Sequence, residues 1–388
     1  MTNTGVIVDE LMRLGAPGKH PASASFGIRG PEDSEIHADG WARLPGGNAA
    51  GEKMRPETLV DLASVTKVAS TTVLAMLLCA ARQLDLNTPV RRYLPEFQGG
   101  DKDKITVKHL LTHTGGLQPW WPFYFQSSDR RRVRDLACEL PLLTQPGAQW
   151  QYSDVGMILA GFVIEQITGL TLHQAFDELV AHPLGIGAGY GPVPADLTAA
   201  SADSDAYEFG MVARGVPYSV PFAPGSFTGW RREVIRGAVN DGNAAHALGG
   251  VAGHAGLFAS VEDLLLLGAA VVDGDFVPNT ILQQFAEPCG PNAGQSLGFR
   301  RRVLEHGNET SILLWHGGFT GTFFGIIPEK GIVTAGSAMR LYGTLGGIPA
   351  DDTAPDVSEI VATASILDVM LDGTRRALEL ASNSSTAW

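Results

Sequence analysis

Segments with strand character lie at the two ends of this chain and enclose a long middle part that has little of it. Residues 22–29 and 35–42 form a hairpin pattern around a polar turn. Short runs rich in β-branched or aromatic residues return only near the other end, at 298–304, 310–315, 322–327 and 331–337. Such distant strands most economically join one antiparallel sheet, flanked by the first and last helices. The pattern predicts an α+β fold with a mostly helical insert.

The expected helices fill the middle part and close both ends. Near-helical apolar spacing predicts a long helix over residues 64–84, and a last helix is predicted over 357–380. A short amphipathic helix opens the chain, with Val6, Leu11 and Leu14 on its apolar side. Further helices are expected at 107–112, 130–136, 154–168, 172–181 and 261–272.

Charge and cysteine usage narrow the class of protein. A formal net charge of -13 argues against nucleic acid or an anionic membrane as the main partner, because like charges repel. The first residues show no basic stretch followed by an apolar run, and the apolar residues 68–81 are too few to span a bilayer. The three cysteines, Cys79, Cys138 and Cys289, have no metal-type spacing. We expect reduced thiols in a cytoplasmic protein, or a secreted one if a leader has been removed.

Ser64 and Lys67 form a Ser-x-x-Lys motif at the start of the predicted long helix. Residues three apart share a helix face, so the Lys67 amine can reach the Ser64 hydroxyl. A serine hydroxyl is a poor nucleophile until a base takes its proton, and lysine can serve if burial or positive charge lowers its pKa. Backbone N–H groups at the helix start favour an oxyanion there. Alone the motif is weak, since a capping serine with a solvated lysine gives the same pattern.

Tyr152 is a second candidate group, in the segment Gln-Tyr-Ser-Asp that follows a Pro-Gly turn and precedes a helix. A tyrosine at such a junction can point its hydroxyl into a cleft, and positive charge nearby makes its phenolate accessible for proton transfer. The alternative is a buried core tyrosine with Asp154 as a helix cap. Both interpretations can hold together.

The segment Trp-His-Gly-Gly-Phe-Thr-Gly-Thr at 315–322 closes a predicted strand with small residues. Glycines let a substrate lie close against a strand edge, and a backbone N–H there can complete an oxyanion hole. His316 adds a titratable group facing the site. The alternative is a tight Gly-rich turn with a structural histidine.

With these three motifs in this order, the chain resembles the serine β-lactamase-related family. This family includes class C β-lactamases, penicillin-binding proteins and D-Ala-D-Ala peptidases, and family VIII carboxylesterases. Ser64 and Lys67 match its Ser-x-x-Lys motif, Tyr152 its Tyr-x-Asn motif, and His316-Gly317-Gly318 its Lys-Thr-Gly motif or a histidine variant. Connecting segments that also look similar are 105–117, 183–185, 248–260 and 317–328.

The resemblance covers about residues 20–340 and implies how the chain is organised. It implies an α/β sandwich domain built from residues 1–66 and 287–388, and a mostly helical domain from 67–286. The active site would lie in the cleft between the two.

The resemblance also implies a role for each matched residue. Ser64 would attack a carbonyl carbon, and Lys67 with Tyr152 would move the serine proton. The backbone N–H groups of Ser64 and Phe319 would bind the oxyanion. The remaining matched residues would be His316 in catalysis, with Asp154, Gly317 and Gly318 in substrate binding.

Two departures from the family pattern bear on the substrate. Asp154 replaces the usual amide of the second motif, which removes a hydrogen-bond donor and adds negative charge near Lys67. His316 replaces the lysine of the third motif, which weakens permanent attraction for a substrate carboxylate. Both favour neutral esters or amides over penicillins and carboxylate-terminated peptides.

An aromatic cluster and a loop-rich stretch are candidates for the pocket wall. The cluster contains Trp120, Trp121 and Phe123, which by family placement would border the substrate and select apolar acyl groups. Packing between helices is an equal alternative. We interpret the Pro-, Gly- and Ser-rich residues 190–242 as long surface loops that shape a cleft.

Other motifs carry less weight. Residues 294–298 match Gly-x-Ser-x-Gly but lack the preceding strand and following helix that a nucleophile elbow needs. His109 and His113 could share a helix face, but zinc would need a further ligand, so we favour structural roles. His246 and His254 flank a Gly-rich loop, and the sequence names no partner for either.

Three functions remain open at this point. The first is a serine hydrolase acting through an acyl-enzyme on an ester or amide, most simply a carboxylesterase. The second is a β-lactamase or D-Ala-D-Ala carboxypeptidase, and the third is a non-catalytic sensor on the same fold. The expected partner is a small-molecule ester, amide or β-lactam, with no cofactor, metal, nucleic acid or membrane.

Overall fold

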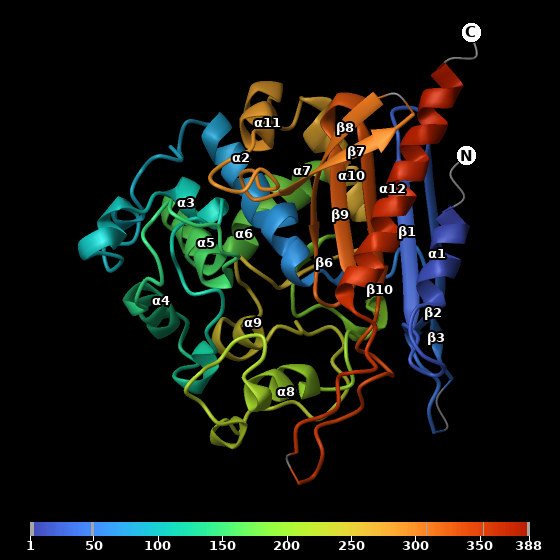
Figure 1. Cartoon of the computed structure of the whole chain (residues 1–388), viewed down its shortest axis with the longest axis horizontal. Coiled ribbons are helices and arrows are strands. Elements are labelled where there is room, and N and C mark those ends of the chain that lie inside the picture. Colours follow the sequence, from blue (N-terminus) through green and yellow to red (C-terminus); the bar gives the residue numbers. More distant parts are fainter. Residues whose placement is uncertain (1–3, 48–49, 308, 352, 386–388) are drawn as a thin grey trace.

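The computed structural model describes residues 4–47, 50–307, 309–351 and 353–385, and its central feature is a seven-stranded antiparallel sheet. Its strand order is β3-β2-β1-β10-β9-β8-β7, so strands from the two ends of the sequence meet at β1 and β10, as predicted (Figure 1). The strands are β1 (Ser23–Arg29), β2 (Ser34–Arg43), β3 (Glu52–Lys53), β7 (Arg300–His306), β8 (Glu309–Gly317), β9 (Thr322–Ile327) and β10 (Ile332–Ala338).

Helices cover both faces of this sheet. The terminal helices α1 (Thr4–Met12) and α12 (Thr363–Ser385) pack together on one face, and α10 (Val261–Asp273) packs on the other (Figure 1). Side chains alternate between the faces along a strand, so Phe323 joins the core under α1 and α12, whereas Phe324 joins the core on the α10 side. The α+β sandwich is confirmed.

Helix α1 is buried through a set of residues that only partly matches the expected one. Ile7, Val8 and Leu11 are buried against the sheet, whereas Val6 is 40% exposed. The expected face was wrong for Val6, because the helix begins at Thr4 and its contact with β1 and β2 sets the orientation.

The middle of the chain forms a mostly helical part beside the sheet. Helix α5 (Asp154–Thr168) lies at its centre with its residues from Val155 to Ile164 buried, and its bounds are those predicted. A small sheet, β4-β6-β5, lies between this part and the large sheet; its strands are β4 (Val60–Asp61), β5 (Gly189–Tyr190) and β6 (Leu257–Ala259). The other helices are α2 (Val73–Ala80), α3 (Val107–Leu111), α4 (Arg130–Glu139), α6 (Leu172–Phe176), α7 (His182–Leu184), α8 (Ala206–Arg214), α9 (Gly242–Ala247) and α11 (Asn279–Ala286).

Two details modify the expected organisation. Helix α8 lies inside the stretch interpreted as loops, and Gly215 ends it in a left-handed conformation. Helix α10 falls within residues 67–286, assigned to the helical domain, yet it packs on β1, β9 and β10. The domain boundaries therefore stay a prediction.

The predicted long helix at 64–84 is not one regular α-helix. It starts as a 3₁₀ turn, Ala63–Val65, continues as a π-helix, Lys67–Thr72, and becomes α-helical only at α2. Residues Ala63–Ala80 are long and apolar enough to cross a membrane, but 78% of this segment is buried inside the protein, as in a core helix.

Candidate active site

Three side chains from distant parts of the sequence meet at Ser64. The Lys67 Nζ atom lies 2.9 Å from Ser64 Oγ, and the phenol oxygen of Tyr152 lies 3.0 Å from the same oxygen. Tyr152 comes from the loop just before α5, whereas Ser64 and Lys67 lie at the start of the helical segment that leads into α2. The hydroxyl, the amine and the phenol are thus within hydrogen-bond reach of one another.

The backbone around Ser64 is shaped by its neighbours. Ala63 has a φ of 46°, a left-handed conformation that non-glycine residues rarely adopt. Its N–H donates to Asp61 Oδ1 at 2.9 Å, and Asp61 is fixed in turn by the pairing of β4 with β6. Strain of this kind recurs at functional sites, where the surrounding structure maintains it. Here it presents Ser64 at the tip of a tight turn.

The π-helix places Lys67 because its threonines bond outside the usual helical pattern. The Thr72 hydroxyl donates to the Lys67 carbonyl five residues back, at 2.7 Å. The Thr71 hydroxyl donates to the Gly253 carbonyl at 2.7 Å, and the Thr66 hydroxyl accepts the Leu257 N–H at 3.1 Å. These bonds tie the segment to residues 253–257, and π-turns of this kind are frequent at functional sites.

Lys67 is held as an ammonium ion. Its side chain is fully buried, and Nζ has three acceptors: Ser64 Oγ, Asp154 Oδ1 at 2.8 Å and the His254 carbonyl at 3.0 Å. Burial alone would lower the pKa of Lys67, but the Asp154 carboxylate and Tyr152 outweigh it and raise the pKa to about 12. The condition under which a lysine could act as the base, a lowered pKa, is therefore not met by Lys67, because Asp154 is its direct ion-pair partner.

Tyr152 is half-buried among cationic and aromatic groups. The His113 and His316 rings lie 4.8 Å and 5.8 Å from its ring, and Lys67 Nζ lies 5.0 Å from it. Burial raises the pKa of Tyr152, and the Lys67 ammonium opposes this rise. The tyrosine is a neutral phenol at rest, next to a cation that stabilises its phenolate.

His113 and His109 have the structural roles that we favoured. His113 Nδ1 accepts the Ser153 N–H at 3.2 Å, and burial together with the positive charge of Lys67 lowers the pKa of His113 to about 3. A neutral His113 therefore supports the loop that carries Tyr152. His109 Nδ1 accepts the Thr106 N–H at 3.1 Å and caps α3.

His316 is a neutral side chain on β8. Its Nδ1 atom lies 2.8 Å from the Gly317 carbonyl, an acceptor, so Nδ1 carries the proton. Its Nε2 atom is buried and has no hydrogen-bond partner among the described residues. Burial, then the charges of Lys67 and Arg300, lower the pKa of His316 well below its usual range. This residue therefore supplies no positive charge where the family has a lysine.

The glycines after His316 are required by packing within the protein. A Cβ on Gly318 would lie 2.6 Å from the Leu62 carbonyl oxygen, and one on Gly317 would lie 2.6 Å from Leu367. The Thr322 hydroxyl also donates to the Leu62 carbonyl, at 2.7 Å. The turn after β8 is therefore fastened directly beside Ser64, while a substrate role for either glycine stays a prediction.

The predicted oxyanion donor Phe319 lies in that turn. Its carbonyl accepts a bond from Arg340 Nε at 2.6 Å, and within the part of the chain described its N–H donates to no atom. The Thr320 hydroxyl donates to the Asp61 carbonyl at 3.0 Å and so fixes the turn against the Ser64 segment. A free N–H in this place suits an oxyanion.

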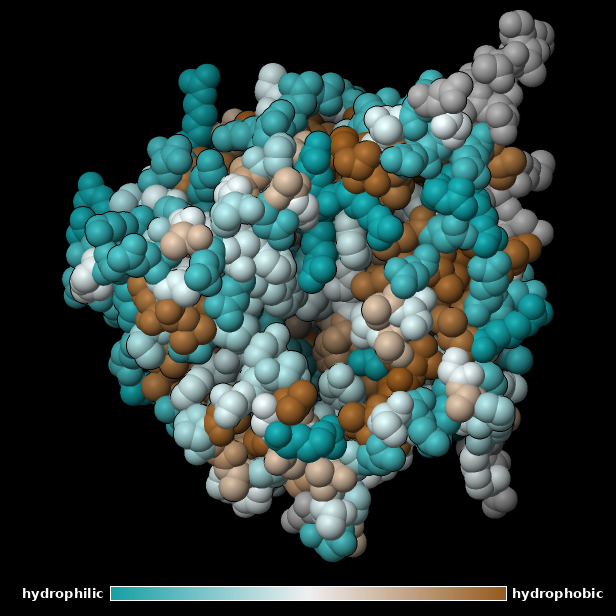
Figure 2. All heavy atoms as spheres, viewed as in Figure 1, coloured by the Kyte–Doolittle hydropathy of each residue, from teal (hydrophilic) through white to brown (hydrophobic). Residues whose placement is uncertain are grey.

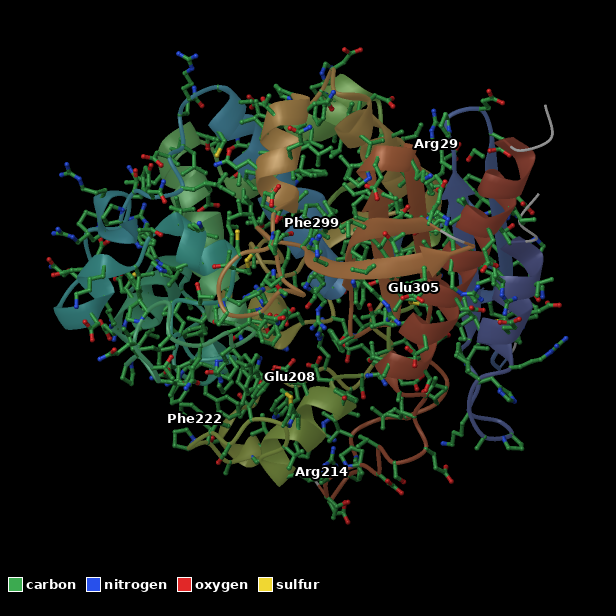
Figure 3. All side chains as sticks on the ribbon, turned by 45° about the horizontal axis from the view of Figure 1, so that its top comes forward. Arg29, Glu208, Arg214, Phe222, Phe299 and Glu305 are labelled. Carbon is green, nitrogen blue, oxygen red and sulfur yellow. The ribbon has the colours of Figure 1, made fainter. Side chains whose placement is uncertain are left out.

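Sequence reasoning missed Arg300, the first residue of β7. Its guanidinium lies 5.7 Å from the Tyr152 ring and 5.7 Å from the Trp315 ring, with which it is paired across the hairpin. Among the residues that the structure describes, no carboxylate forms a salt bridge with it. Figure 3 shows the neighbouring Phe299 at the end of the hairpin that faces the helical part, while Glu305 lies at its other end.

The aromatic cluster divides into wall and core. Trp120 stacks on Tyr218 at 5.9 Å, and burial, then the nearby Asp154 and Tyr152, raise the pKa of Tyr218 to about 12, which places Tyr218 beside the site. Phe123 is fully buried, and its role in substrate binding stays a prediction. Trp121 packs instead on Phe222, at 5.6 Å, in the outer loop (Figure 3).

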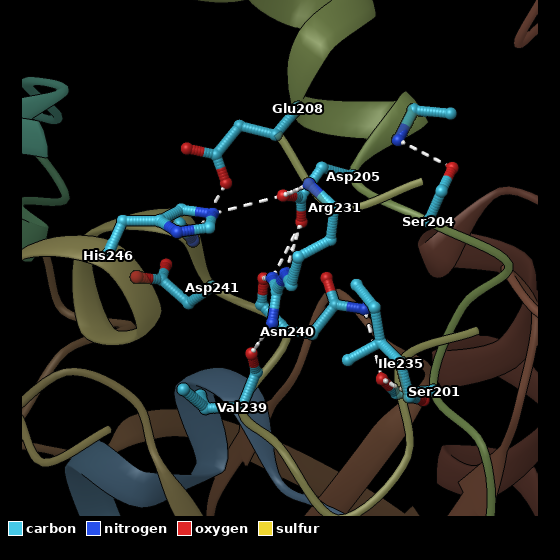
Figure 4. Close-up of polar contacts among 12 residues, drawn as sticks. Ser201, Ser204, Asp205, Glu208, Arg231, Ile235, Val239, Asn240, Asp241 and His246 are labelled. Atoms are coloured by element: carbon cyan, nitrogen blue, oxygen red, sulfur yellow. Dashed lines mark hydrogen bonds and ion pairs between the residues drawn. The ribbon is translucent and has the colours of Figure 1, made fainter. Parts of the chain in front are cut away.

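The remaining candidates lie away from Ser64. Ser296 is fully buried with its hydroxyl 3.4 Å from the Phe299 carbonyl, which supports dismissing the Gly-x-Ser-x-Gly match. His246 pairs with Asp205 at 3.0 Å, as Figure 4 shows, and His254 pairs with Asp241 at 2.9 Å. Figure 2 shows a hollow near the centre of the visible face, where Figure 1 places the beginning of the helical segment that leads into α2.

An antiparallel sheet between helices, with a serine hydroxyl held between a lysine and a tyrosine, is the arrangement of active-site-serine hydrolases. The sequence profile of the Beta-lactamase family matches residues 28–352. The chain belongs to this family of serine hydrolases and has its β-lactamase/transpeptidase-like fold.

Known relatives fit this placement. N-acetylmuramyl-L-alanine amidase of Bacillus subtilis (strain 168) is 30% identical over 309 residues, which are 71% of this chain and 66% of that protein. The chain thus spans just under two thirds of that relative. The D-amino acid amidase of Ochrobactrum anthropi SV3 superimposes with a TM-score of 0.67 at 19% identity, covering 98% of both chains. EstCE1, a hydrolase with promiscuous acyltransferase activity, gives 0.66 at 19% identity, covering 96% of this chain and 97% of its own.

Proposed function

We propose that this protein is a carboxylesterase-type acyl hydrolase that cleaves neutral esters, and more slowly amides, through an acyl-enzyme on Ser64. The observation that carries the proposal is the contact of Ser64 Oγ with both Lys67 Nζ and the Tyr152 hydroxyl. A sensor would have no need of a buried ammonium and phenol converging on one hydroxyl, since burying them is costly.

In this mechanism Tyr152 handles the proton and Lys67 supplies charge. Ser64 attacks the carbonyl carbon while its proton passes to the Tyr152 oxygen, and the Tyr152 proton passes to the leaving alkoxide. Lys67, an ammonium ion between Asp154 and Ser64, stabilises negative charge on both reacting oxygens. The N–H groups of Ser64 and Phe319 bind the oxyanion. Water then cleaves the acyl-enzyme by the reverse transfers.

The charges around Ser64 support a neutral acyl group. The Asp154 carboxylate neutralises the charge of Lys67, and His316 is uncharged. Lys67 and His316 therefore offer no free cation to a substrate carboxylate. Trp120 and Tyr218 form a stacked aromatic wall beside the site, which suits an apolar acyl chain.

Arg300 favours a second candidate, a carboxypeptidase-type activity on peptides that end in a carboxylate. Its guanidinium lies over the Tyr152 ring without a carboxylate partner among the described residues. A substrate carboxylate could supply that partner through a charge-assisted hydrogen bond. Because Arg300 lies at the edge of the site, this activity would require the peptide to extend along β8.

A substrate panel tests the proposal. Short-chain p-nitrophenyl esters, a chromogenic cephalosporin and a D-Ala-D-Ala peptide are compared by kcat/KM, with intact mass spectrometry to detect acyl-Ser64. We expect the esters to be the best substrates. Preference for the peptide would favour the second candidate, preference for the cephalosporin would favour a β-lactamase, and no turnover with no adduct would favour a sensor.

A further inference from the structure

We infer that the buried pair Asp241–His254 positions Lys67 and Ser64 for reaction, although neither of its side chains touches the substrate. This inference rests on the proposed use of Ser64 as a nucleophile. It starts from the third acceptor of the Lys67 ammonium, the backbone carbonyl of His254, at 3.0 Å. An ammonium has three hydrogens to donate, so this carbonyl fixes the rotation of Nζ and hence the direction of the bond to Ser64 Oγ.

Gly253, which directly precedes the residue whose carbonyl accepts from Lys67, lies between the two elements that carry the polar groups of the site. A Cβ on Gly253 would collide with the Met157 carbonyl oxygen and lie 2.9 Å from the Gly161 nitrogen, so this glycine lies directly on α5. Helix α5 begins at Asp154, the ion-pair partner of Lys67. On the other side the Thr71 hydroxyl donates to the Gly253 carbonyl.

The imidazole of His254 anchors this peptide from the opposite direction. Its Nε2 atom lies 2.9 Å from Asp241 Oδ1, and the side chain is 1% exposed. Its Nδ1 atom is buried without a hydrogen-bond partner among the described residues. Among the described residues, the bond to Asp241 is therefore the one hydrogen bond of the ring, and losing it would remove the side-chain anchor of the His254 backbone.

Asp241 also connects to the nucleophile through the main chain. The Asn240 N–H donates to Asp61 Oδ2 at 2.6 Å, and the Ala63 N–H, next to Ser64, donates to Asp61 Oδ1 at 2.9 Å. Asp241 is itself fixed, since its Oδ1 accepts the Ala244 N–H at 2.9 Å and caps α9. Residues 240–241 are thus connected to Ser64 through Asp61 and to Lys67 through His254.

A second histidine–carboxylate pair provides a matched control. His246 lies 3.0 Å from Asp205, and that carboxylate is held by a pair of bonds from Arg231 (Figure 4). Neither His246 nor Asp205 bonds to Lys67, Ser64 or Asp61 in the described structure. Both pairs join a histidine to a carboxylate, although His246 is 14% exposed and His254 is 1% exposed. Arg231 of the control pair donates to the Asn240 carbonyl at 2.8 Å, but that pair makes no bond to Lys67 or Asp61 in the described structure.

The experiment compares His254→Ala, His254→Gln and His246→Ala with the wild-type protein. The probe is a fluorophosphonate that labels the reactive serine, and its labelling rate is followed by intact mass spectrometry across pH 6 to 11. Ester kcat and KM are measured in parallel. The labelling rate reports the reactivity of Ser64 whether or not esters are the true substrates.

We expect His254→Ala to slow labelling and lower kcat by about 10- to 100-fold, the size of effect that small misplacement of a reacting group produces, with KM within about threefold. Its basic pH limb should move to lower pH, because a displaced backbone carbonyl at residue 254 bonds the Lys67 ammonium less well, and the ammonium then gives up its proton more easily. His254→Gln, which keeps a side-chain N–H donor, should recover part of the rate. His246→Ala should stay within about threefold of wild type.

Equal losses in His254→Ala and His246→Ala, or a wild-type labelling rate in His254→Ala, would overturn the inference. If His254→Ala does not fold, the comparison of His254→Gln with His246→Ala decides by the same criteria. A wild-type protein that is labelled at Ser64 but hydrolyses no ester would contradict the proposed function alone.

Discussion

Asp154 Oδ1 lies 2.8 Å from Lys67 Nζ, and this buried ion pair determines the charge state of the whole site. Here the carboxylate keeps Lys67 protonated, so the proton of Ser64 needs another acceptor, and Tyr152 is the group within reach. The roles proposed for Lys67, as a positive charge, and for Tyr152, as the proton carrier, both follow from the presence of Asp154.

Asp154→Asn should move the pH dependence of the reaction. Without the carboxylate, burial dominates and the pKa of Lys67 falls from about 12. The basic limb of the kcat/KM profile for a p-nitrophenyl ester should therefore shift to lower pH by at least about one unit, a change equivalent to about 1.4 kcal/mol. A profile that coincides with wild type between pH 6 and 11 would show that the ion pair does not control the site.

Tyr152→Phe should cost about 2–4 kcal/mol of transition-state stabilisation, or about 30- to 1,000-fold in kcat, because it removes the proposed proton carrier and keeps the ring. The contacts of the ring with His113 and His316 should persist. Tyr218→Phe, which removes a nearby hydroxyl with no hydrogen bond to Ser64, is the control and should lose far less. Equal kcat in wild type and Tyr152→Phe would exclude Tyr152 from proton transfer.

Arg300→Gln should separate the two candidate functions. If a substrate carboxylate pairs with Arg300, the variant should lose about 10- to 100-fold in kcat/KM on a D-Ala-D-Ala peptide, the cost of a hydrogen bond to a charged group. Neutral ester turnover should change little. Arg302→Gln, an exposed arginine on the same strand, serves as the control. A peptide rate unaffected by Arg300→Gln would remove the argument for the second candidate.

Glu208 should make the protein less stable as the pH rises. Its carboxyl is buried, and burial together with the Asp241 carboxylate raises its pKa from 4.5 to about 8 (Figure 4). The folded state therefore binds this proton more tightly than the unfolded state, so its contribution is fully present below about pH 4.5 and is lost as the pH rises to about 8.

Glu208→Gln tests this contribution because the amide oxygen can still accept the Gly242 N–H. Urea unfolding at pH 5.5 and pH 8 should show a smaller loss of unfolding free energy in Glu208→Gln than in wild type. Glu178→Gln, an exposed glutamate, should behave as wild type. The same pH-dependent loss in all three proteins would mean that Glu208 is ionised when folded.

Local sequence patterns were enough for some of the regular elements. Helix α5 and strand β9 begin and end where periodicity predicts, because their apolar residues pack as regular elements do. The convergence of Ser64, Lys67 and Tyr152 followed from motif order and family resemblance. Spacing alone would not have brought residue 152 to residue 64.

What the sequence could not provide depends on tertiary contacts. The π-helix at Lys67 arises because threonines bond to residues 253–257, far along the chain. Arg300 faces Tyr152 only because β7 pairs with β8 in one particular register. Trp120 and Phe123 are both buried, but only Trp120 stacks on Tyr218 beside the site, and this difference depends on tertiary contacts.

The most direct test of the account is Ser64→Ala, compared with Ser296→Ala for ester turnover and for covalent labelling by a fluorophosphonate, with circular dichroism to confirm folding. We predict that Ser64→Ala is folded, is not labelled and loses ester hydrolysis to the level of the buffer, while Ser296→Ala reacts as wild type. Ester hydrolysis near the wild-type rate in Ser64→Ala, or a label mapped to another serine, would contradict the account.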